Sequence, residues 1–471
     1  MSIETASHAG FAPATPADLP FIRHQLERER LDTERLEPEQ FTTIREGEQI
    51  VACGRIKPYD QTYELGSVWV AESRRGRGLG EMITRELVRR FPQDEVYITT
   101  DAAVGLPVYY ERLGFLRTEI LPGELVAKIK RVRKRLNRDA VGMVYDRRIE
   151  RLPSIADVYR ARHLIERYLP RTPLLRNLHL SRQLGCEAYI KYENLLPIGA
   201  FKVRGGVYLC AGMSEEERAR GIVGASTGNH GQSLAYGAHL CRARCVIVVP
   251  EEANPLKVES MQALGAVVQF HGENFEEARI WAEEYARREG MRFVHHINTP
   301  ELIAGVATMS LEIVEDLPDV DVVVTPIGGG SAAVGHCLVA KALRPGVQII
   351  GVQAAGAPAV YRSWKERKLQ EAPIETQAEG LATGRAYYLS VKTFIDRMDD
   401  MLLVTEKEIG EAVVLLARFA HQVAEESGAT SLAGAMQLGE RIRGKRVGII
   451  LSGGNMTLDG LRRVLNEHEP T

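Results

Sequence analysis

The sequence predicts an α/β fold divided into at least two domains. The chain has 471 residues, which is more than a single hydrophobic core usually accommodates. Short apolar stretches typical of buried strands alternate with helical patterns over most of the chain, as in parallel sheets covered by helices on both faces. Several of these stretches run directly into glycine-rich turns. We therefore expect binding sites where strands end and helices begin.

Composition excludes several classes of protein. The formal net charge is −2, which gives no reason to expect a nucleic acid or an anionic membrane as partner. No apolar run approaches the ~18 residues that a membrane span needs. The N-terminus lacks the basic and apolar regions of a signal peptide, so we expect a cytoplasmic protein. The six cysteines are dispersed without a C-x-x-C pair, which predicts reduced thiols and no metal site.

A basic run at residues 128–138 raises the question of an acidic partner. Ile129, Val132 and Leu136 recur within it at helical spacing. This spacing predicts an amphipathic helix whose lysines and arginines face solvent. We therefore do not expect the run to bind nucleic acid.

Lys202 is the residue around which the larger part of the chain is organised. It lies among apolar and small residues in Pro197-Ile198-Gly199-Ala200-Phe201-Lys202, downstream of a predicted strand at residues 187–191. Burial of a lysine lowers its pKa and makes the neutral amine available as a nucleophile. The alternative is a lysine whose stem packs on apolar surface while its head reaches water.

Three further stretches favour the nucleophile over that alternative. Residues 225–232 form a small-residue turn that opens a predicted helix, where free N–H groups suit an anion. Residues 322–331 form a strand ending in three glycines, whose backbone can close around a phosphate. Residues 447–455 form a buried strand ending in Ser452 and two glycines. Each of these turns is common by itself in α/β proteins. Their combination with Lys202 indicates a nucleophilic lysine.

From about Leu152 onward the chain resembles the threonine/serine dehydratase family of pyridoxal-phosphate enzymes, which have the fold of tryptophan synthase β (fold type II). The motifs are Ala-Phe-Lys-Val-Arg-Gly at Lys202, Ser-Thr-Gly-Asn-His from Ser226, the glycine turn, and Ser-Gly-Gly-Asn from Ser452. The resemblance implies that Lys202 binds the cofactor and acts as the general base. It implies a cofactor site of Phe201, Lys202, Asn229, Gly328, Gly329, Gly330, Ser331 and Ser452. It implies that the substrate carboxylate binds at Ser226, Thr227, Gly228, Asn229 and His230.

The implied reaction is elimination of water from a β-hydroxy amino acid such as threonine, serine or phenylserine, followed by hydrolysis of the aminoacrylate to a 2-oxo acid and ammonia. Three residues depart from the family pattern. Ala200 replaces a usual serine, and Gln353 stands where several relatives have a metal-binding glutamate, so we predict no cation site. Thr227 places a hydroxyl where racemases carry a catalytic serine. Amino-acid racemisation or β-replacement therefore remains an alternative.

The N-terminal part contains a second candidate site. A predicted strand at residues 63–70 leads into a basic, glycine-rich turn and a helix from Glu81. Such a turn suits a pyrophosphate, through its N–H groups and the positive end of the helix dipole. The alternative is a solvated turn. The turn comprises Arg75, Gly76, Arg77, Gly78, Leu79 and Gly80.

This turn is similar to the Arg/Gln-x-x-Gly-x-Gly/Ala motif of the GNAT acetyltransferases, which holds the pyrophosphate of acetyl-CoA. Tyr110, in Tyr-Glu-Arg-Leu-Gly-Phe, matches a family tyrosine that acts as a general acid, although a packing tyrosine is nearly as good an interpretation. The resemblance implies a mixed α/β domain at residues 1–147, followed by a pyridoxal-phosphate region of two α/β subdomains at residues 148–471. The N-terminal domain would transfer acetyl groups or sense acyl-CoA, and by analogy with relatives we expect a homodimer or larger homo-oligomer.

Overall fold

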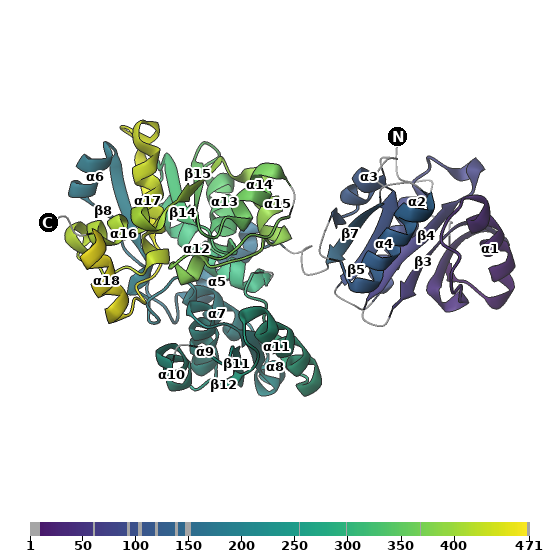
Figure 1. Cartoon of the computed structure of the whole chain (residues 1–471), viewed down its shortest axis with the longest axis horizontal. Helices are drawn as coiled ribbons and strands as arrows, with labels where there is room; N and C mark the ends of the chain where they lie inside the picture. Colours follow the sequence, from purple (N-terminus) through teal and green to yellow (C-terminus); the bar gives the residue numbers. More distant parts are fainter. Residues whose placement is uncertain are drawn as a thin grey trace. The chain divides into compact units, whose positions relative to one another are not determined.

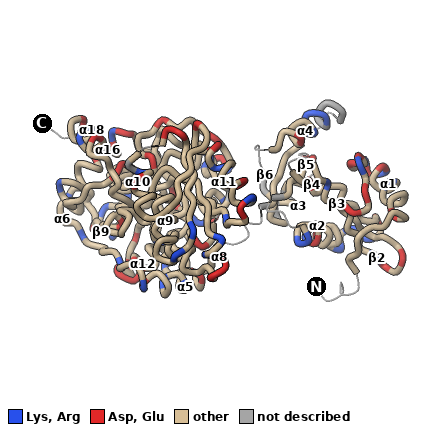
Figure 2. The backbone as a smooth tube through the Cα atoms, turned by 90° about the horizontal axis from the view of Figure 1, so that it is seen from below, with Lys and Arg blue, Asp and Glu red and all other residues tan. Residues whose placement is uncertain are grey.

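The computed structural model forms two compact units, Met1–Glu150 and Arg151–Thr471 (Figure 1). It describes residues 10–59, 62–91, 95–101, 106–117, 121–136, 140–146, 152–253, 255–297, 299–367 and 369–468. The expected domain boundary between residues 147 and 148 lies outside these ranges and stays a prediction. Basic and acidic residues are interspersed in both units (Figure 2). Within the described ranges, no helix has the length and apolar character needed to cross a bilayer.

The first unit is a mixed sheet with helices. Its strands occur in the order β1-β2-β3-β4-β5-β7-β6. Neighbouring strands are antiparallel except β4 and β5, which are parallel. The strands are β1 (Gly10–Pro13), β2 (Phe41–Glu46), β3 (Gln49–Pro58), β4 (Tyr63–Val70), β5 (Glu95–Asp101), β6 (Leu116–Arg117) and β7 (Ala140–Asp146). The helices are α1 (Leu19–Arg28), α2 (Leu79–Arg90), α3 (Leu106–Arg112) and α4 (Gly123–Leu136).

Strands β4 and β5 pair at one end. Within the described ranges they share a single ladder position, Glu64 with Tyr97, near the start of each strand. Further along, β4 contains an irregularity opposite Cys53–Arg55, where Ser67 has φ +49°. A left-handed conformation is uncommon for serine and often marks a functional segment. The parting strands and the irregularity lie just before the turn that opens α2.

One prediction about this unit is wrong at a single residue, although Lys130 and Arg131 of the same run are exposed as predicted. Lys128, on α4, does not face solvent. Its Nζ donates to Glu64 (2.6 Å) and to Asp32 (3.2 Å). Burial raises the pKa of Asp32, but the charge of Lys128, the hydrogen bond from the N–H of Glu34 and the charges of Arg55 and Lys57 outweigh it and bring the pKa to about 2. Helical spacing correctly predicted α4, but it could not show that two carboxylates from other segments lie over one of its lysines.

The second unit contains two sheets of parallel strands. The smaller sheet has the order β12-β11-β10-β13, and the larger has the order β16-β15-β14-β17-β9-β8, with β8 antiparallel at its edge. The smaller sheet consists of β10 (Ile222–Ala225), β11 (Cys245–Val249), β12 (Val267–Phe270) and β13 (Arg292–Phe293). The larger consists of β8 (Leu174–Arg176), β9 (Glu187–Tyr192), β14 (Val322–Pro326), β15 (Gln348–Ala354), β16 (Asp400–Val404) and β17 (Arg446–Leu451).

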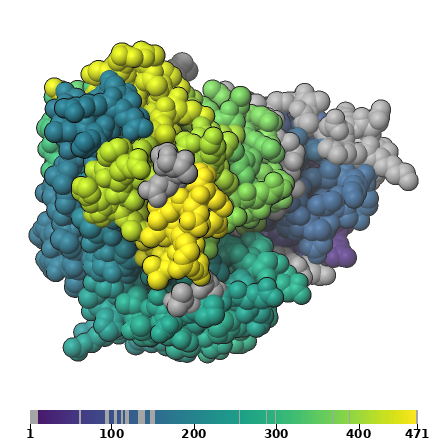
Figure 3. Space-filling model, turned by 60° about the vertical axis from the view of Figure 1, so that its left-hand side comes forward, coloured from purple at the N-terminus to yellow at the C-terminus, as the bar shows by residue number. Residues whose placement is uncertain are grey.

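Helices cover both sheets, as the alternating pattern predicted (Figure 1). Apolar side chains of α16 and α17 pack on one side of the larger sheet, and those of α12, α13 and α15 pack on the other. The last helix, α18, lies at the surface of the unit (Figure 3). The helices are α5 (Ile155–Ile165), α6 (Leu178–Leu184), α7 (Val203–Ala211), α8 (Glu215–Arg220), α9 (Asn229–Cys241), α10 (Pro255–Ala263), α11 (Phe275–Glu289), α12 (Pro300–Asp316), α13 (Ser331–Leu343), α14 (Ala359–Glu366), α15 (Tyr388–Arg397), α16 (Glu406–Leu415), α17 (Glu426–Leu438) and α18 (Leu458–His468).

Candidate active site

Lys202 lies immediately before α7, on a segment held from two sides. Ala200 forms an isolated antiparallel bridge with Gly453, and the N–H of Phe201 donates to the carbonyl of Ser452 (3.0 Å). The carbonyl of Lys202 accepts from Ser233 Oγ of α9 (2.6 Å). The lysine backbone is thus fixed between the end of β17, in the larger sheet, and a helix that covers the smaller sheet.

The side chain of Lys202 reaches the glycine turn. Its Nζ donates to Ser331 Oγ (2.9 Å) and lies 5.1 Å from the centre of the Phe201 ring. Burial lowers the pKa of Lys202 from 10.5 to about 8, because an apolar environment disfavours the charged form. A large fraction of the amine is therefore neutral at mildly alkaline pH, as the sequence predicted.

A buried ionic cluster stabilises the start of α7, two residues beyond Lys202. Arg204 donates to Glu193 (2.7 Å) and to Glu312 on α12 (2.7 Å). Lys191 of β9 forms a second ion pair with Glu312 and donates to the carbonyl of Thr172. The two cations balance the two carboxylates, which is the condition under which buried charges are tolerated. Sequence reasoning did not identify this cluster.

The glycine turn between β14 and α13 is closely packed. An added methyl group would overlap the carbonyl of Gly380 at Gly328, and Ile297 at Gly329. Gly330 has φ +101° at the N-cap of α13 and lies against Ser390. Only glycine lets the backbone turn in this space, so that the first N–H groups of α13 and the Ser331 hydroxyl present donors suited to a phosphate.

Asn229 lies at the start of α9 within a chain of amide contacts. Its Oδ1 accepts from Asn455 Nδ2 (2.7 Å), and its Nδ2 donates to Glu425 Oε1 (2.7 Å). Ser452, at the end of β17, is buried, and its Oγ lies 3.3 Å from the carbonyl of Ser427, to which it donates. Sequence reasoning singled out Asn229 and Ser452 but not Glu425, because no motif links Glu425 to the turn.

The turn from Ser226 to His230 is partly buried. Ser226 Oγ accepts from the N–H of Gly228 (3.2 Å), and Thr227 is partly exposed. His230 is only 8% exposed, and its Nε2 has no hydrogen-bond partner among the described residues. Burial and the neighbouring charge of Lys202 lower the pKa of His230 to about 3, so a neutral imidazole lies beside the lysine. The substrate-binding role of this turn stays a prediction.

Aromatic rings that the sequence did not single out lie beside these residues. His296 stacks on His295 (centroids 4.7 Å apart) and meets the edge of Tyr387 (5.3 Å). It also lies 6.2 Å from His230. A methyl group at Gly329 would touch the Tyr387 ring. These rings therefore form a wall between the glycine turn and His230.

The second candidate site of the sequence is a cavity of about 560 Å³ in the first unit. The basic turn and the end of β4 line it, together with residues of α2 and α3 and of the segment after α1. Arg75 is paired with Glu29 (2.6 Å) and Arg74 with Glu46 (2.7 Å). The residues that line the cavity are Glu29, Leu31, Val68, Trp69, Val70, Arg74, Arg75, Gly76, Gly78, Leu79, Gly80, Glu81, Leu106 and Tyr109.

Two adjacent tyrosines have different environments near this cavity. Tyr109 lines it, with its hydroxyl close to Gly80 at the start of α2. Tyr110 is 8% exposed and packs in the apolar core against Phe115. The general-acid role predicted for Tyr110 stays a prediction, and the packing alternative describes its environment well.

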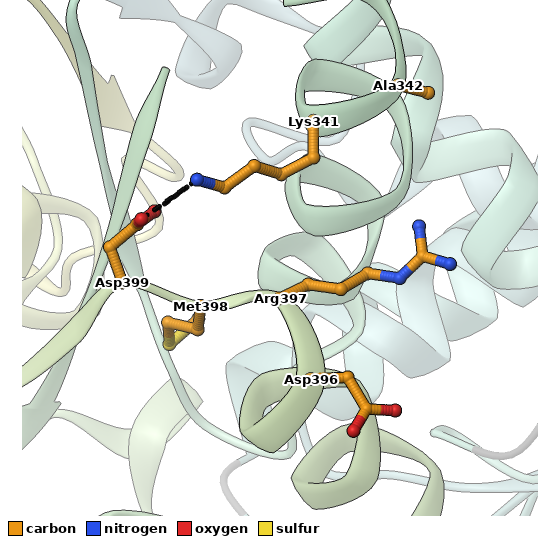
Figure 4. Close-up of a pocket in the computed structure, with 6 residues that line it drawn as sticks. All are labelled: Lys341, Ala342, Asp396, Arg397, Met398 and Asp399. Atoms are coloured by element: carbon orange, nitrogen blue, oxygen red, sulfur yellow. Dashed lines mark hydrogen bonds and ion pairs between the residues drawn. The ribbon is translucent and has the colours of Figure 1, made fainter. Parts of the chain in front are cut away.

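A further hollow, of about 370 Å³, lies at the starts of β15 and β16 (Figure 4). Lys341 and Asp399 pair across it (2.6 Å), and Asp399 also accepts from the N–H of Ile349. It is at the opposite end of the parallel strands from the glycine turn. Its charged groups join α13 to the sheet. No cluster of three or more metal-ligating side chains occurs in the described part of the chain.

The residues around Lys202 fit pyridoxal phosphate. A lysine with a lowered pKa can form a Schiff base with the aldehyde. The Gly328–Ser331 turn would hold the phosphate, and Asn229 and Ser452 lie on the segments that bracket Lys202. The fold and this site define a pyridoxal-phosphate enzyme with parallel sheets.

Comparison with known proteins agrees with this class. The sequence profile of the family described as "Pyridoxal-phosphate dependent enzyme" matches residues 165–453, and that of the "Acetyltransferase (GNAT) family" matches residues 11–115. An L-threonine ammonia-lyase from Thermotoga maritima is 37% identical over 67% of this chain and 78% of its own length. A serine racemase from Dictyostelium discoideum is 33% identical over 66% of this chain and 98% of its own length.

Solved structures show the same relationship. The processed form of threonine deaminase isoform 2 from Solanum lycopersicum superposes with a TM-score of 0.64 at 28% identity, covering 68% of this chain and 95% of that one. The chain belongs to the pyridoxal-phosphate dependent enzyme family and carries a GNAT-family domain before it. Its similarity to threonine ammonia-lyases marks it as a lyase. These findings confirm the family and the fold class predicted from the sequence.

Proposed function

We propose that the second unit eliminates water from a β-hydroxy amino acid, and that the released enamine takes up water again to give a 2-oxo acid and ammonia. The observation that carries this proposal is the contact of Lys202 with Ser331, which places an amine of lowered pKa on the glycine turn. The substrate is threonine, serine or a bulkier analogue such as phenylserine. Relatives described as threonine dehydratases and as an L-threo-3-hydroxyaspartate ammonia-lyase support this range.

The cofactor supplies a ring that stabilises negative charge at the substrate α-carbon. The chain would bind its phosphate through Gly328, Gly329, Gly330 and Ser331, and Phe201 would lie beside it. Lys202 takes the α-proton, since its lowered pKa leaves a neutral amine as base. The Ser226–His230 turn binds the substrate carboxylate at the N-terminus of α9. Neutral His230 and the aromatic wall exclude water from the lysine.

Racemisation is the second candidate for this unit. It is favoured by Thr227, whose hydroxyl stands in the turn beside Asn229, and by the resemblance to a serine racemase. Thr227 would exchange a proton with the α-carbon from the side opposite Lys202. A β-replacement is the less favoured alternative, because the residues after the lysine are Val203 and Arg204 instead of Asp-Arg.

One experiment separates these reactions. The holoenzyme is incubated with L-serine, D-serine, L-threonine, threo-3-phenylserine and threo-3-hydroxyaspartate, and ammonia, 2-oxo acid and the remaining enantiomers are measured. We expect the wild-type holoenzyme to release ammonia and a 2-oxo acid from at least one of these substrates. Lys202→Ala should release neither. Interconversion of enantiomers without ammonia would identify a racemase. A holoenzyme that retains its cofactor absorption but releases nothing would contradict the lyase proposal.

We further propose that the first unit binds acetyl-CoA. The cavity at the start of α2 combines N–H groups of a helix N-terminus with two arginines, Arg74 and Arg75, as suits a pyrophosphate. Thiol release from acetyl-CoA in the presence of free amino acids would identify an acetyltransferase. Binding without thiol release would identify an acyl-CoA sensor and contradict a catalytic role. The homo-oligomer stays a prediction.

A further inference from the structure

Glu425 lies against two segments of the cofactor site, and the reaction proposed above assigns it no task. It precedes α17, and its backbone N–H donates to the carbonyl of Gly453 (3.2 Å). Its Oε1 accepts from Asn229 Nδ2 (2.7 Å). A methyl group at Gly453 would overlap this same oxygen. A side chain at position 453 would therefore displace the carboxyl group of Glu425 from Asn229.

The hydrogen bonds of Asn229 to Asn455 and Glu425 fix the orientation of its amide group. Asn455 Nδ2 donates both to Asn229 Oδ1 (2.7 Å) and to the carbonyl of Ile198 (2.8 Å). Asn229 Oδ1 must therefore be the acceptor, and Nδ2 the donor to Glu425. An amide nitrogen carries two hydrogens. One of them is used by Glu425, which leaves the second available to donate to a bound cofactor.

The surroundings of Glu425 bring the pH at which its carboxyl group changes charge close to neutral. The charged groups that face it are Lys257 of α10 and Glu426 of its own helix. Each has another partner, since Lys257 pairs with Glu379 and Glu426 with Arg463. Burial raises the pKa of Glu425 to about 7, against the effects of Asn229 and Lys257. The carboxyl group is therefore negative above neutral pH and uncharged below it.

We propose that Glu425 is a positioning residue for pyridoxal phosphate, which turns the Asn229 amide toward the cofactor ring and places a titratable negative charge behind it. The inference rests on the proposed function, since it requires the cofactor to be bound at Lys202. A negative charge stabilises a positive one nearby. Ionised Glu425 therefore raises the pH at which the bound cofactor loses its proton.

Two substitutions separate the hydrogen bond from the charge. Glu425→Gln keeps an oxygen that accepts from Asn229 but removes the charge. Glu425→Asp keeps the charge but shortens the side chain, so that the bond to Asn229 is lost. Glu426→Gln is the matched control, because it removes a neighbouring carboxylate that is paired with Arg463. The visible absorption of each holoenzyme is titrated between pH 6 and 10, and cofactor affinity is measured by fluorescence.

We expect Glu425→Gln to lower the midpoint of the absorption change by about one pH unit with little loss of affinity. We expect Glu425→Asp to keep the midpoint and to weaken cofactor binding about tenfold, the cost of one hydrogen bond to a charged group. Glu426→Gln should match the wild-type protein in both measurements. Wild-type values for both Glu425 variants would overturn the inference alone. A wild-type protein without cofactor absorption would overturn the proposed function and the inference together.

Discussion

The two glycine-rich turns of this chain look alike in sequence and differ in their physical requirements. In the turn before α2, Gly76 and Gly78 have φ +76° and +78°, and an added methyl group at either would meet no atom within 4 Å. In the turn before α13, a methyl group at Gly328 or Gly329 would overlap a neighbouring segment. The first turn needs glycine for its backbone conformation, and the second also needs it for close packing.

The charged residues around the two turns also differ. Arginines line the first turn, and Glu29 and Glu46 pair with two of them at the surface. The second turn has Ser331 and one lysine of lowered pKa, with the Phe201 ring beside the lysine and Tyr387 beside Gly329. A ligand of the first turn is thus held by exposed charge, whose effect salt screens. A ligand of the second is held by buried backbone donors and shape. Substitutions should therefore affect the two sites by different amounts.

The largest effect is expected at Gly329. Gly329→Ala places a methyl group on Ile297, so Ile297 or the turn must shift, and we expect cofactor affinity to fall about a hundredfold. Fluorescence titration of the apoenzyme with pyridoxal phosphate measures this. The additional change Ile297→Ala should recover part of the loss, because it removes the overlapping atoms. Gly346→Ala is the control, since nothing lies within 4 Å of its added methyl group. An unchanged affinity in Gly329→Ala would show that the turn is not tightly packed.

A smaller effect is expected at Arg75. Arg75→Ala removes one exposed cation from the first turn, and we expect acetyl-CoA affinity to fall about tenfold, the value of one charge-assisted hydrogen bond. Calorimetric titration at two salt concentrations checks this, and the difference between variant and wild type should shrink as salt rises. Arg89→Ala, which alters an exposed arginine paired with Glu86, is the control. Equal affinities at low salt would remove Arg75 from the acetyl-CoA site.

The smallest effect has the opposite sign. Glu29 holds Arg75 at 2.6 Å and competes with an incoming pyrophosphate for its guanidinium group. We expect Glu29→Gln to tighten acetyl-CoA binding about threefold, in line with the modest energy of a surface ion pair. The same calorimetric titration measures it. Weaker binding in this variant would mean that Glu29 orients Arg75 for the ligand instead of competing with it.

The sequence was sufficient where the relevant information is local. Strand and helix periodicity placed β9, β14 and β17, and small residues at their ends predicted the turns around Lys202. Contacts between distant segments could not be predicted from the sequence. Glu425 and Asn229 are 196 residues apart, and Lys128 lies 64 residues from Glu64. A charged residue on a helix surface has the same local pattern whether solvent or a carboxylate from another segment covers it.

The ionic cluster behind Lys202 also determines when the lysine segment can become ordered as the chain is made. Glu312, which pairs with both Lys191 and Arg204, follows Arg204 by 108 residues. At the usual speed of synthesis, the ribosome needs roughly 5–20 seconds to add them. During that interval the emerged segment has two cations and a single carboxylate, Glu193, so burying it would leave a charge unpaired. Lys202 therefore acquires its final environment only after α12 has emerged.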